Sequence, residues 1–399
     1  MQSSIKNYLI VTGGYWAFTI TDGAIRMLVV LYFHLLGYSP FEVAMLFLFY
    51  EFFGIVTNLV GGWLGARIGL NLTMNIGMGM QVVALAALTV PDSYLTVVYV
   101  MAAQALSGIA KDLNKMSAKA SVKTIARDGQ DSTLFKWVAL LTGSKNALKG
   151  VGFFVGAGLL EWIGFRGALS LLAGSLLMVL IITALLLPSG VGKMKSKPKF
   201  SEVFSKVPEI NWLSAARFFL FGSRDVWFVV GLPVFLYEVL GWGFAQVGAF
   251  LALWVIGYGI VQALSPRLLK QSHAGQGPNG NSARLWALIL ALFPASIAIA
   301  LQQGWPADSV LIIGLILFGI VFAINSAIHS YLILAYSDHD KVAMNVGFYY
   351  MSNAGGRLVG TVLSGWAYQT QGLTGCLWWS FGFVMMAALI SFMLPSSGK

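Results

Sequence analysis

The chain has few charged residues, few acids and a single cysteine. Only 10% of its 399 residues are Asp, Glu, Lys or Arg, whereas an average soluble domain has about 25%. One cysteine, Cys376, excludes an internal disulfide and a cysteine-based metal cluster. What the sequence has instead is 58% hydrophobic residues and 45 glycines. This composition is typical of a polytopic membrane protein.

Motifs of catalysis are also missing from the sequence. It contains no Walker loop, no H-x-x-x-H or C-x-x-C metal motif and no nucleophile elbow. We therefore predict that the protein is not an enzyme and uses no cofactor. Its net charge of +10 is interpreted as a topology signal and an attraction to anionic membrane lipid, and not as a nucleic-acid surface.

Apolar runs long enough to cross a membrane as helices recur along the whole chain. In the first half we predict them near 8–36, 41–63, 72–90, 94–110, 134–160 and 167–187. In the second half we predict them near 210–240, 244–264, 283–303, 309–335, 345–369 and 373–394. Turns such as Gly164-Phe165-Arg166 and Gly304-Trp305-Pro306 separate them. The fold class expected is an all-α integral membrane protein with twelve transmembrane helices.

A basic segment divides these helices into two groups. Residues 188–209 carry five lysines and read as a cytoplasmic linker between an N-terminal six-helix bundle, 1–187, and a C-terminal one, 210–399. With the N-terminus in the cytoplasm, nearly all lysines and arginines outside the helices fall on the cytoplasmic side, and Arg166 lies outside. We therefore expect both termini in the cytoplasm.

The two halves are related by a weak internal repeat. Shifting one half by about 203 residues aligns Asp22 with Asp225, and Leu36-Gly37-Tyr38 with Leu240-Gly241-Trp242 one position later. Pseudo-symmetric halves are typical of secondary transporters, whose halves move around a substrate site near the membrane midplane. The repeat predicts a transport function.

The turn after the second predicted helix resembles the signature of the major facilitator superfamily, G-x-x-x-D-R-x-G. Gly62, Arg67 and Gly69 match it, while Ala66 replaces the aspartate. Gln104 stands where many proton-driven exporters have an arginine. These departures argue against an ordinary proton-coupled drug exporter.

Longer stretches resemble the organoarsenical efflux permeases of the ArsJ family. They are residues 15–19 and 21–26, 104–112, 134–137 with 142–150, and 214–227. The resemblance implies export of 1-arseno-3-phosphoglycerate, which forms when glyceraldehyde-3-phosphate dehydrogenase uses arsenate in place of phosphate. It implies a functional link to that dehydrogenase, arsenate resistance and a place in the inner membrane. We expect a monomer with a small anionic substrate.

Charged residues inside the predicted helices are unbalanced. Six are basic, namely Arg26, Lys145, Lys149, Arg217, Arg224 and Arg357, and three are acidic, namely Asp22, Glu51 and Asp225. A charge at the bilayer centre costs about 2.5 to 3.5 kcal/mol even on lenient scales. The excess of positive charge therefore predicts a bound anion.

The basic residues divide by chemistry. Lys145, Arg224 and Arg357 lie roughly 16, 21 and 18 Å into their helices at 1.5 Å per residue, near the middle of the membrane. A guanidinium binds two oxygens of an oxyanion at once, whereas an ammonium acts as a point charge. We assign Arg224 and Arg357 to the oxyanion ends of the substrate, and Lys145 and Lys149 to its attraction. Arg217 either contacts substrate or extends toward the cytoplasmic membrane surface.

Each acid leaves two interpretations open. Asp22 and Arg26 are spaced i, i+4 and form either a structural pair or a gating pair. Asp225 lies about 100° around the helix from Arg224, so we expect its partner to be Arg217 or Lys149. Glu51 either pairs with a basic group or binds a proton.

The remaining polar positions have weaker assignments. His329 is either a packed side chain or a proton carrier. A secondary polar lining is assigned to Asn58, Gln262, Asn325, Asn353, Tyr258 and Trp227. Lys111, Lys115, Lys119 and Lys123 recur every four residues, and form either a solvated basic face or an electrostatic funnel for a cytoplasmic anion.

Overall fold

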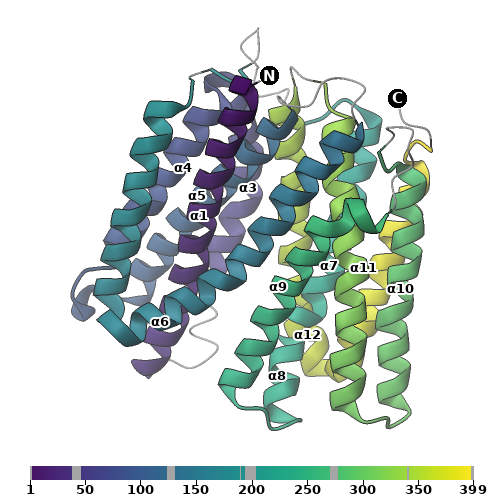
Figure 1. The fold of residues 1–399 in the computed structure, drawn as a ribbon. Helices are drawn as coiled ribbons and strands as arrows, with labels where there is room; N and C mark the ends of the chain where they lie inside the picture. The colour runs from purple at the N-terminus through teal and green to yellow at the C-terminus, as the bar shows by residue number, and fades with distance from the viewer. Residues whose placement is uncertain are drawn as a thin grey trace. The chain divides into compact units, whose positions relative to one another are not determined.

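The computed structural model describes residues 2–37, 46–123, 131–188, 190–193, 204–269, 277–338 and 341–396, and every regular element in these ranges is a helix (Figure 1). Eight helices among them are long and apolar enough to cross a membrane. Two of the eight, α6 and α12, each contain two crossings separated by a break. Helices α3 and α5, which carry charged residues, are not among these eight, and with them the described residues form twelve membrane helices. The predicted fold class is confirmed.

The helices of the first half begin and end close to the predicted positions. They are α1 (Gln2–Leu35), α3 (Leu48–Ile68), α4 (Leu70–Ala87), the short 3-10 helix η1 (Asp92–Tyr94), α5 (Val97–Lys123) and α6 (Asp131–Leu186). Helix α5 runs past the predicted end at residue 110. The predicted start of the second membrane helix, near residue 41, lies outside the described residues.

The second half follows the same plan. Its helices are α7 (Pro208–Phe228), α8 (Gly231–Glu238), α9 (Phe244–Leu268), α10 (Gly280–Gln302), α11 (Ala307–Ala335), α12 (Val342–Ile390) and the 3-10 helix η3 (Ser391–Met393). Much of the predicted linker, residues 194–203, lies outside the described residues.

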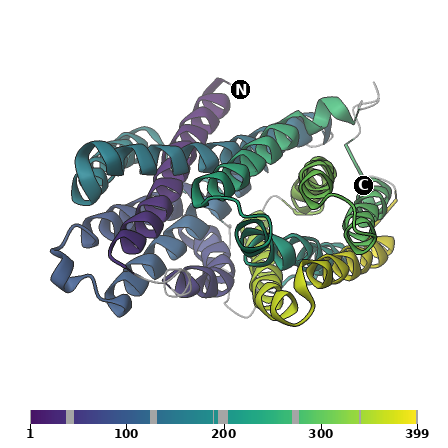
Figure 2. The same cartoon turned by 90° about the horizontal axis from the view of Figure 1, so that it is seen from below.

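The chain forms two compact units. The N unit consists of Met1–Arg127, Ser144–Phe204 and Ser337–Met351. The C unit consists of Asp128–Gly143, Ser205–Tyr336 and Ser352–Lys399. Within the N unit, α5 packs against α1, α3 and α4, and within the C unit, α11 packs against α9 and α10 (Figure 2).

Two glycines break the longest helices. Gly164 in α6 has φ 71° and Gly372 in α12 has φ 69°, in the left-handed region that favours glycine. Each break falls in a gap that the sequence predicts, between residues 160 and 167 and between 369 and 373. The predicted turn at Gly164 is confirmed.

A third break was not predicted. The sequence indicates one helix over 210–240, but the structure ends α7 at Phe228 and begins α8 at Gly231. Pro233 explains the break, because its ring clashes with the carbonyl four residues earlier and its nitrogen has no hydrogen to donate. The side-chain oxygen of Ser364 accepts the N–H groups of Val230 and Gly231 at 3.2 and 3.1 Å.

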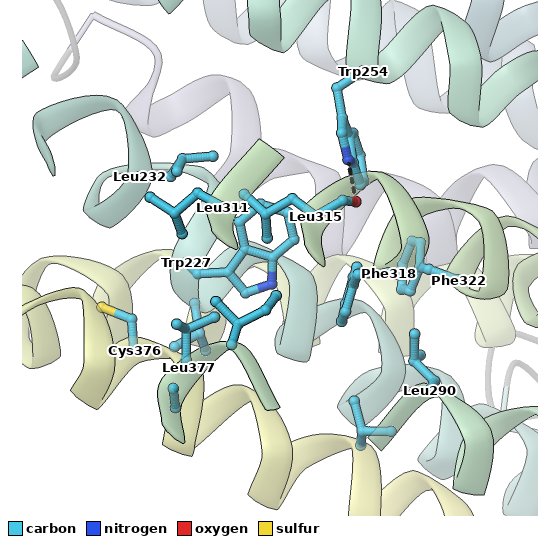
Figure 3. Close-up of a cluster of buried hydrophobic side chains, with 14 of the residues drawn as sticks. Trp227, Leu232, Trp254, Leu290, Leu311, Leu315, Phe318, Phe322, Cys376 and Leu377 are labelled. Carbon is cyan, nitrogen blue, oxygen red and sulfur yellow. Dashed lines mark hydrogen bonds between the residues drawn. The ribbon is translucent and has the colours of Figure 1, made fainter. Parts of the chain in front are cut away.

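Aromatic side chains fill the core of the C unit (Figure 3). Trp227 is 1% exposed and packs edge-to-face against Trp254 and Phe318, with ring centroids 5.7 and 5.2 Å apart. Trp254 donates to the Leu315 carbonyl at 2.8 Å. The structure therefore places Trp227 in an apolar core, where it packs, and not in the polar lining assigned to it.

Glycines allow two helix pairs to approach very closely. In the N unit, a Cβ atom on Gly152 of α6 would lie 2.6 Å from the Ile20 carbonyl oxygen and 3.0 Å from the Gly23 Cα of α1. In the C unit, a Cβ atom on Gly360 of α12 would lie 2.6 Å from the Gly222 carbonyl oxygen of α7. Small residues at the crossings of membrane helices allow the two backbones to approach this closely.

We predict that Gly152→Ala destabilises the N unit, because the added methyl group meets backbone atoms that cannot turn away. The expected cost is about 1–3 kcal/mol, measured as a lower thermal unfolding temperature of the purified protein. Gly158→Ala is the matched control, since a Cβ atom there meets nothing within 4 Å. Equal unfolding temperatures for the two variants would contradict the close crossing.

Candidate functional site

Asp22 is the centre of a charged cluster in the N unit. Its carboxylate accepts hydrogen bonds from the Lys149 ammonium at 3.0 Å and from the Tyr50 hydroxyl at 2.5 Å, and its side chain is 2% exposed. The predicted pair of Asp22 with Arg26 is therefore wrong. Lys149 is the partner of Asp22 instead, because α6, which carries Lys149, crosses α1 next to Asp22.

Arg26 pairs with Glu51 instead. The distance from its Nη1 to the Glu51 Oε1 is 3.7 Å, and its guanidinium lies 5.0 and 5.5 Å from the ring centres of Phe47 and Tyr50. The Lys111 ammonium lies 4.0 Å from the other Glu51 oxygen. Glu51 therefore pairs with basic groups, which is the first of the two interpretations given for it.

The basic stripe on α5 is largely buried. Lys111 and Lys119 are 8% and 3% exposed, so a solvated basic face is wrong for these two residues. Asp112 explains part of the burial, since its carboxylate binds Lys115 at 2.5 Å and Lys111 at 3.8 Å. Packing of α5 against three neighbouring helices covers the rest. The side chain of Lys123 lies outside the described residues.

Sequence reasoning missed two members of the N-unit cluster, Tyr50 and Asp112, and assigned Lys111 only to the basic stripe. Asp112 and Lys111 fall beyond the predicted end of their helix, which hid them from the count of membrane charges. The signal available in the sequence was the spacing of Asp112 and Lys115, which are three residues apart on one helix and can form an ion pair. Lys145, which was predicted, is half-buried and donates to the Asn146 side-chain oxygen at 3.3 Å.

The C unit has its own charged cluster around Asp225. The Arg224 guanidinium contacts the Asp225 Oδ1, with its Nε at 2.6 Å. Arg357 of α12 contacts the Oδ2 through its Nε at 3.0 Å. The predicted partners, Arg217 and Lys149, are therefore wrong. Angular separation on α7 did not prevent the pair with Arg224, because a long arginine side chain bends back to its neighbour.

Arg217 is buried and does not extend to the membrane surface. It is 2% exposed and donates to the Asn353 side-chain oxygen at 2.8 Å and to the Ser326 carbonyl and hydroxyl oxygens at 3.3 and 3.2 Å. The Phe221 ring centre lies 3.8 Å from the Arg217 Cζ and 5.2 Å from the Arg224 Cζ. One aromatic ring thus contacts both guanidiniums of α7.

Polar side chains assigned to the lining converge on the same place. The Ser326 hydroxyl accepts from Tyr258 at 3.0 Å and from Gln262 at 3.1 Å, beside its contact with Arg217. Gln262, Tyr258 and Asn353 are thus neighbours of Arg217. Asn58 lies in the N unit, where it donates to the carbonyl of Gly54.

Two polar residues of α11 are completely buried. Asn325 and His329 are both 0% exposed, and neither side chain has a hydrogen-bond partner among the described residues. Buried polar groups are normally paired with protein atoms or ordered water. The geometry gives His329 no contact by which to distinguish packing from proton transfer, so its role stays a prediction.

The two clusters repeat one arrangement. In each, an aspartate on the first helix of a half pairs with a basic residue on the fifth: Asp22 with Lys149, and Asp225 with Arg357. The basic residue stands three positions before a close-packed glycine, Gly152 or Gly360. The aspartates are the pair aligned by the sequence repeat.

The clusters differ in charge balance. In the N unit, Arg26, Lys111, Lys115 and Lys149 share the carboxylates of Asp22, Glu51 and Asp112. In the C unit, Arg224 and Arg357 bind Asp225, and Arg217 donates to the neutral side chains of Asn353 and Ser326. Lys119 and Lys145 add two further basic residues to the N unit, so both units keep a positive excess among the described residues, and the C unit has more basic residues per carboxylate.

Membrane helices arranged in two structural repeats are typical of secondary transporters. The chain belongs to the Major Facilitator Superfamily, whose family model matches residues 11–327. This confirms the superfamily predicted from Gly62, Arg67 and Gly69.

Solved structures show the same fold. A bacterial homologue of the iron transporter ferroportin in an outward-facing state is 15% identical, with a TM-score of 0.74 over 96% of this chain and 98% of that one. The human organic anion transporter TETRAN is 15% identical, with a TM-score of 0.76 over 97% and 99%. The proton:xylose symporter XylE is 13% identical, with a TM-score of 0.76 over 98% and 95%. No curated protein matches the chain.

We predict that Lys149→Met costs about 3 kcal/mol of stability, because it leaves the buried Asp22 carboxylate without its cation. Asp22→Asn combined with Lys149→Met should cost less than Lys149→Met alone, since no charge is then left unmatched. Thermal unfolding of both variants, with Asp22→Asn alone completing the cycle, measures the coupling. Strictly additive costs would contradict the ion pair.

Proposed function

We propose that this transporter exports a multiply charged organic oxyanion from the cytoplasm by alternating access, and that the oxyanion is 1-arseno-3-phosphoglycerate. The observation that supports an anionic substrate is the C-unit cluster, in which two guanidiniums share one carboxylate and a third, that of Arg217, donates to neutral side chains. Positive charge inside membrane helices is costly, and an anionic substrate would offset it.

Arg224 and Arg357 are the proposed ligands of an oxyanion end. Their side chains are 16% and 28% exposed, whereas the Asp225 side chain between them is 1% exposed. The two arginine side chains therefore keep accessible surface, whereas that of Asp225 has almost none. Arg217 would bind a second polar group of the substrate. Its neighbours Asn353, Tyr258 and Gln262 would add hydrogen bonds to that group.

Lys145 and Lys149 supply positive charge from the N unit in this proposal. The charge of Lys149 is offset by Asp22 at 3.0 Å, so its contribution is weaker than the sequence implied. Arg26 pairs with Glu51, and we now assign it a structural role ahead of substrate contact.

The identity of the substrate rests on the resemblance to the organoarsenical permeases. Export would remove the unstable product of glyceraldehyde-3-phosphate dehydrogenase acting with arsenate, and the product would fall apart outside to arsenate. The protein would then act as a monomer in the inner membrane, with both termini in the cytoplasm, and would give arsenate resistance.

A second candidate is a carrier of another organophosphate, exchanged for phosphate or coupled to protons. The C-unit cluster favours it equally, because phosphate and arsenate are both tetrahedral oxyanions that a guanidinium binds through two oxygens.

Everted membrane vesicles test the proposal. They should accumulate arsenic only when arsenate, glyceraldehyde-3-phosphate, the dehydrogenase and its nicotinamide cofactor are all supplied. Accumulation from arsenate alone, or without the dehydrogenase, would contradict the proposed substrate. A protonophore in the same vesicles reports whether proton movement drives export, in which case Asp22, Glu51, Asp225 and His329 are the candidate proton carriers.

We predict that Arg357→Gln lowers transport at least a hundredfold, because it removes one of the two accessible guanidiniums; a loss of about 3 kcal/mol corresponds to this factor. Initial uptake rates in the vesicles, normalised to the amount of transporter, measure the effect. Arg284→Gln is the matched control, since Arg284 packs over the Phe392 ring, 4.4 Å from its centre, at the start of α10. Normal transport by Arg357→Gln would remove Arg357 from the site.

A further inference from the structure

We infer that Lys111 of α5 is an anion-binding residue of the N unit, and that its ammonium binds an oxygen of a phosphate-like group on the transported anion. The inference rests on the proposed function in one respect, that the transported solute is an oxyanion. It adds a binding residue that the sequence places only in the basic stripe.

Lys111 is the basic residue of the N-unit network that has no carboxylate of its own. The three acids each have a nearer cation, in the pairs Asp22 with Lys149 at 3.0 Å, Glu51 with Arg26 at 3.7 Å and Asp112 with Lys115 at 2.5 Å. Lys111 lies farther away, at 4.0 Å from Glu51 and 3.8 Å from Asp112. Lys111 therefore carries the one positive charge of this network that exceeds its acids.

The Lys111 ammonium has three N–H donors, and none of them makes a hydrogen bond among the described residues. Both carboxylate contacts are longer than a hydrogen bond, which spans about 2.7–3.2 Å, and the third contact is the Tyr50 ring, whose centre lies 3.8 Å from the Nζ. The side chain is 10% exposed. Water accepts such hydrogen bonds as well, but only an anion also offsets the charge.

The place of Lys111 in the membrane makes its charge costly. It lies about 21 Å along α5 at 1.5 Å per residue, near the middle of a helix of 27 residues. A positive charge there costs free energy unless an opposite charge matches it. The Tyr50 ring lowers this cost by cation–π attraction, and a bound anion would lower it further.

The two acids near Lys111 do not exclude an anion from it. Glu51 is neutralised by Arg26, and Asp112 by Lys115. An ion pair repels an anion much less than a lone carboxylate does, because its two opposite charges nearly cancel at a distance. The ammonium is a point charge, so Lys111 adds attraction, whereas recognition of shape belongs to the guanidiniums.

A purely structural role for Lys111 predicts something different. The Asp112 Oδ2 is buried, accepts no hydrogen bond among the described residues and lies 3.8 Å from the Lys111 Nζ. If Lys111 serves to neutralise this oxygen, its removal should lower stability as Lys149→Met does. If Lys111 carries the excess charge, its removal leaves every acid of the network with a cation and costs little stability.

The test measures binding of inorganic phosphate by calorimetry at constant ionic strength. The parent protein carries Arg357→Gln, so that the C-unit cluster binds phosphate weakly. Adding Lys111→Met should weaken phosphate binding at least about tenfold, the factor expected for one hydrogen bond to a charged group. Adding Glu51→Gln instead should tighten it, because Arg26 then adds a second unmatched charge.

Lys6→Met is the matched control, since it removes the same charge from an exposed side chain of α1 in the same unit. It should leave phosphate binding unchanged. Thermal unfolding without phosphate should be nearly the same for Lys111→Met and its parent.

Four results would each overturn the inference. They are a parent protein that binds no phosphate, unchanged binding after Lys111→Met, no tightening after Glu51→Gln, and a loss of stability in Lys111→Met as large as that in Lys149→Met.

The outcomes separate this inference from the proposed substrate. If the vesicles accumulate arsenic as proposed but Lys111→Met binds phosphate normally, only the role of Lys111 fails. If phosphate binding depends on Lys111 but the vesicles do not accumulate arsenic, the anion-binding role stands and the transported oxyanion is a different one.

Discussion

The structure depends on one constraint, that charge inside apolar helices has to be matched. Both units meet it by the same means, since a glycine crossing brings the first helix of a half against its fifth and sets an aspartate opposite a basic residue. Gly152 serves Asp22 and Lys149, and Gly360 serves Asp225 and Arg357. Lys149 and Arg357 reach their aspartates across these crossings. A substitution that moves the crossing helices apart would therefore also weaken the ion pair.

The two units differ in the charged residues that surround this shared ion pair. In the N unit three acids pair with four of the basic residues, and Tyr50 adds a hydrogen bond to Asp22. In the C unit, the guanidiniums of Arg224 and Arg357 share the Asp225 carboxylate, and those of Arg217 and Arg224 contact the Phe221 ring. The C unit therefore contains more guanidinium groups, whereas the N unit contains an ion-pair network and two further lysines, Lys119 and Lys145. The two halves thus share the pairing of an aspartate on the first helix with a basic residue on the fifth, but they differ in the other charged residues around that pair.

The sequence predicted the fold well and the pairing poorly. Apolar run lengths and the turn at Gly164 depend on local chemistry, so they predicted the twelve helices. The alignment of Asp22 with Asp225 also found the two positions that the structure shows to be equivalent. The pair of Asp22 with Arg26 failed because spacing along one helix says nothing about Lys149, which arrives from another. Burial of Lys111 likewise depends on how three helices cover α5, which no periodicity reveals.

The central claim is that Arg224 and Arg357 bind the oxyanion end of the substrate. Arsenic tests this directly, because it scatters X-rays anomalously and arsenate stands in for that oxyanion end. Crystals of the wild-type protein grown with arsenate should give an arsenic peak between the two guanidiniums, with arsenate oxygens at hydrogen-bond distance, about 2.7–3.2 Å, from nitrogens of both. A peak at another place in the membrane helices, with none at these arginines, would contradict the account.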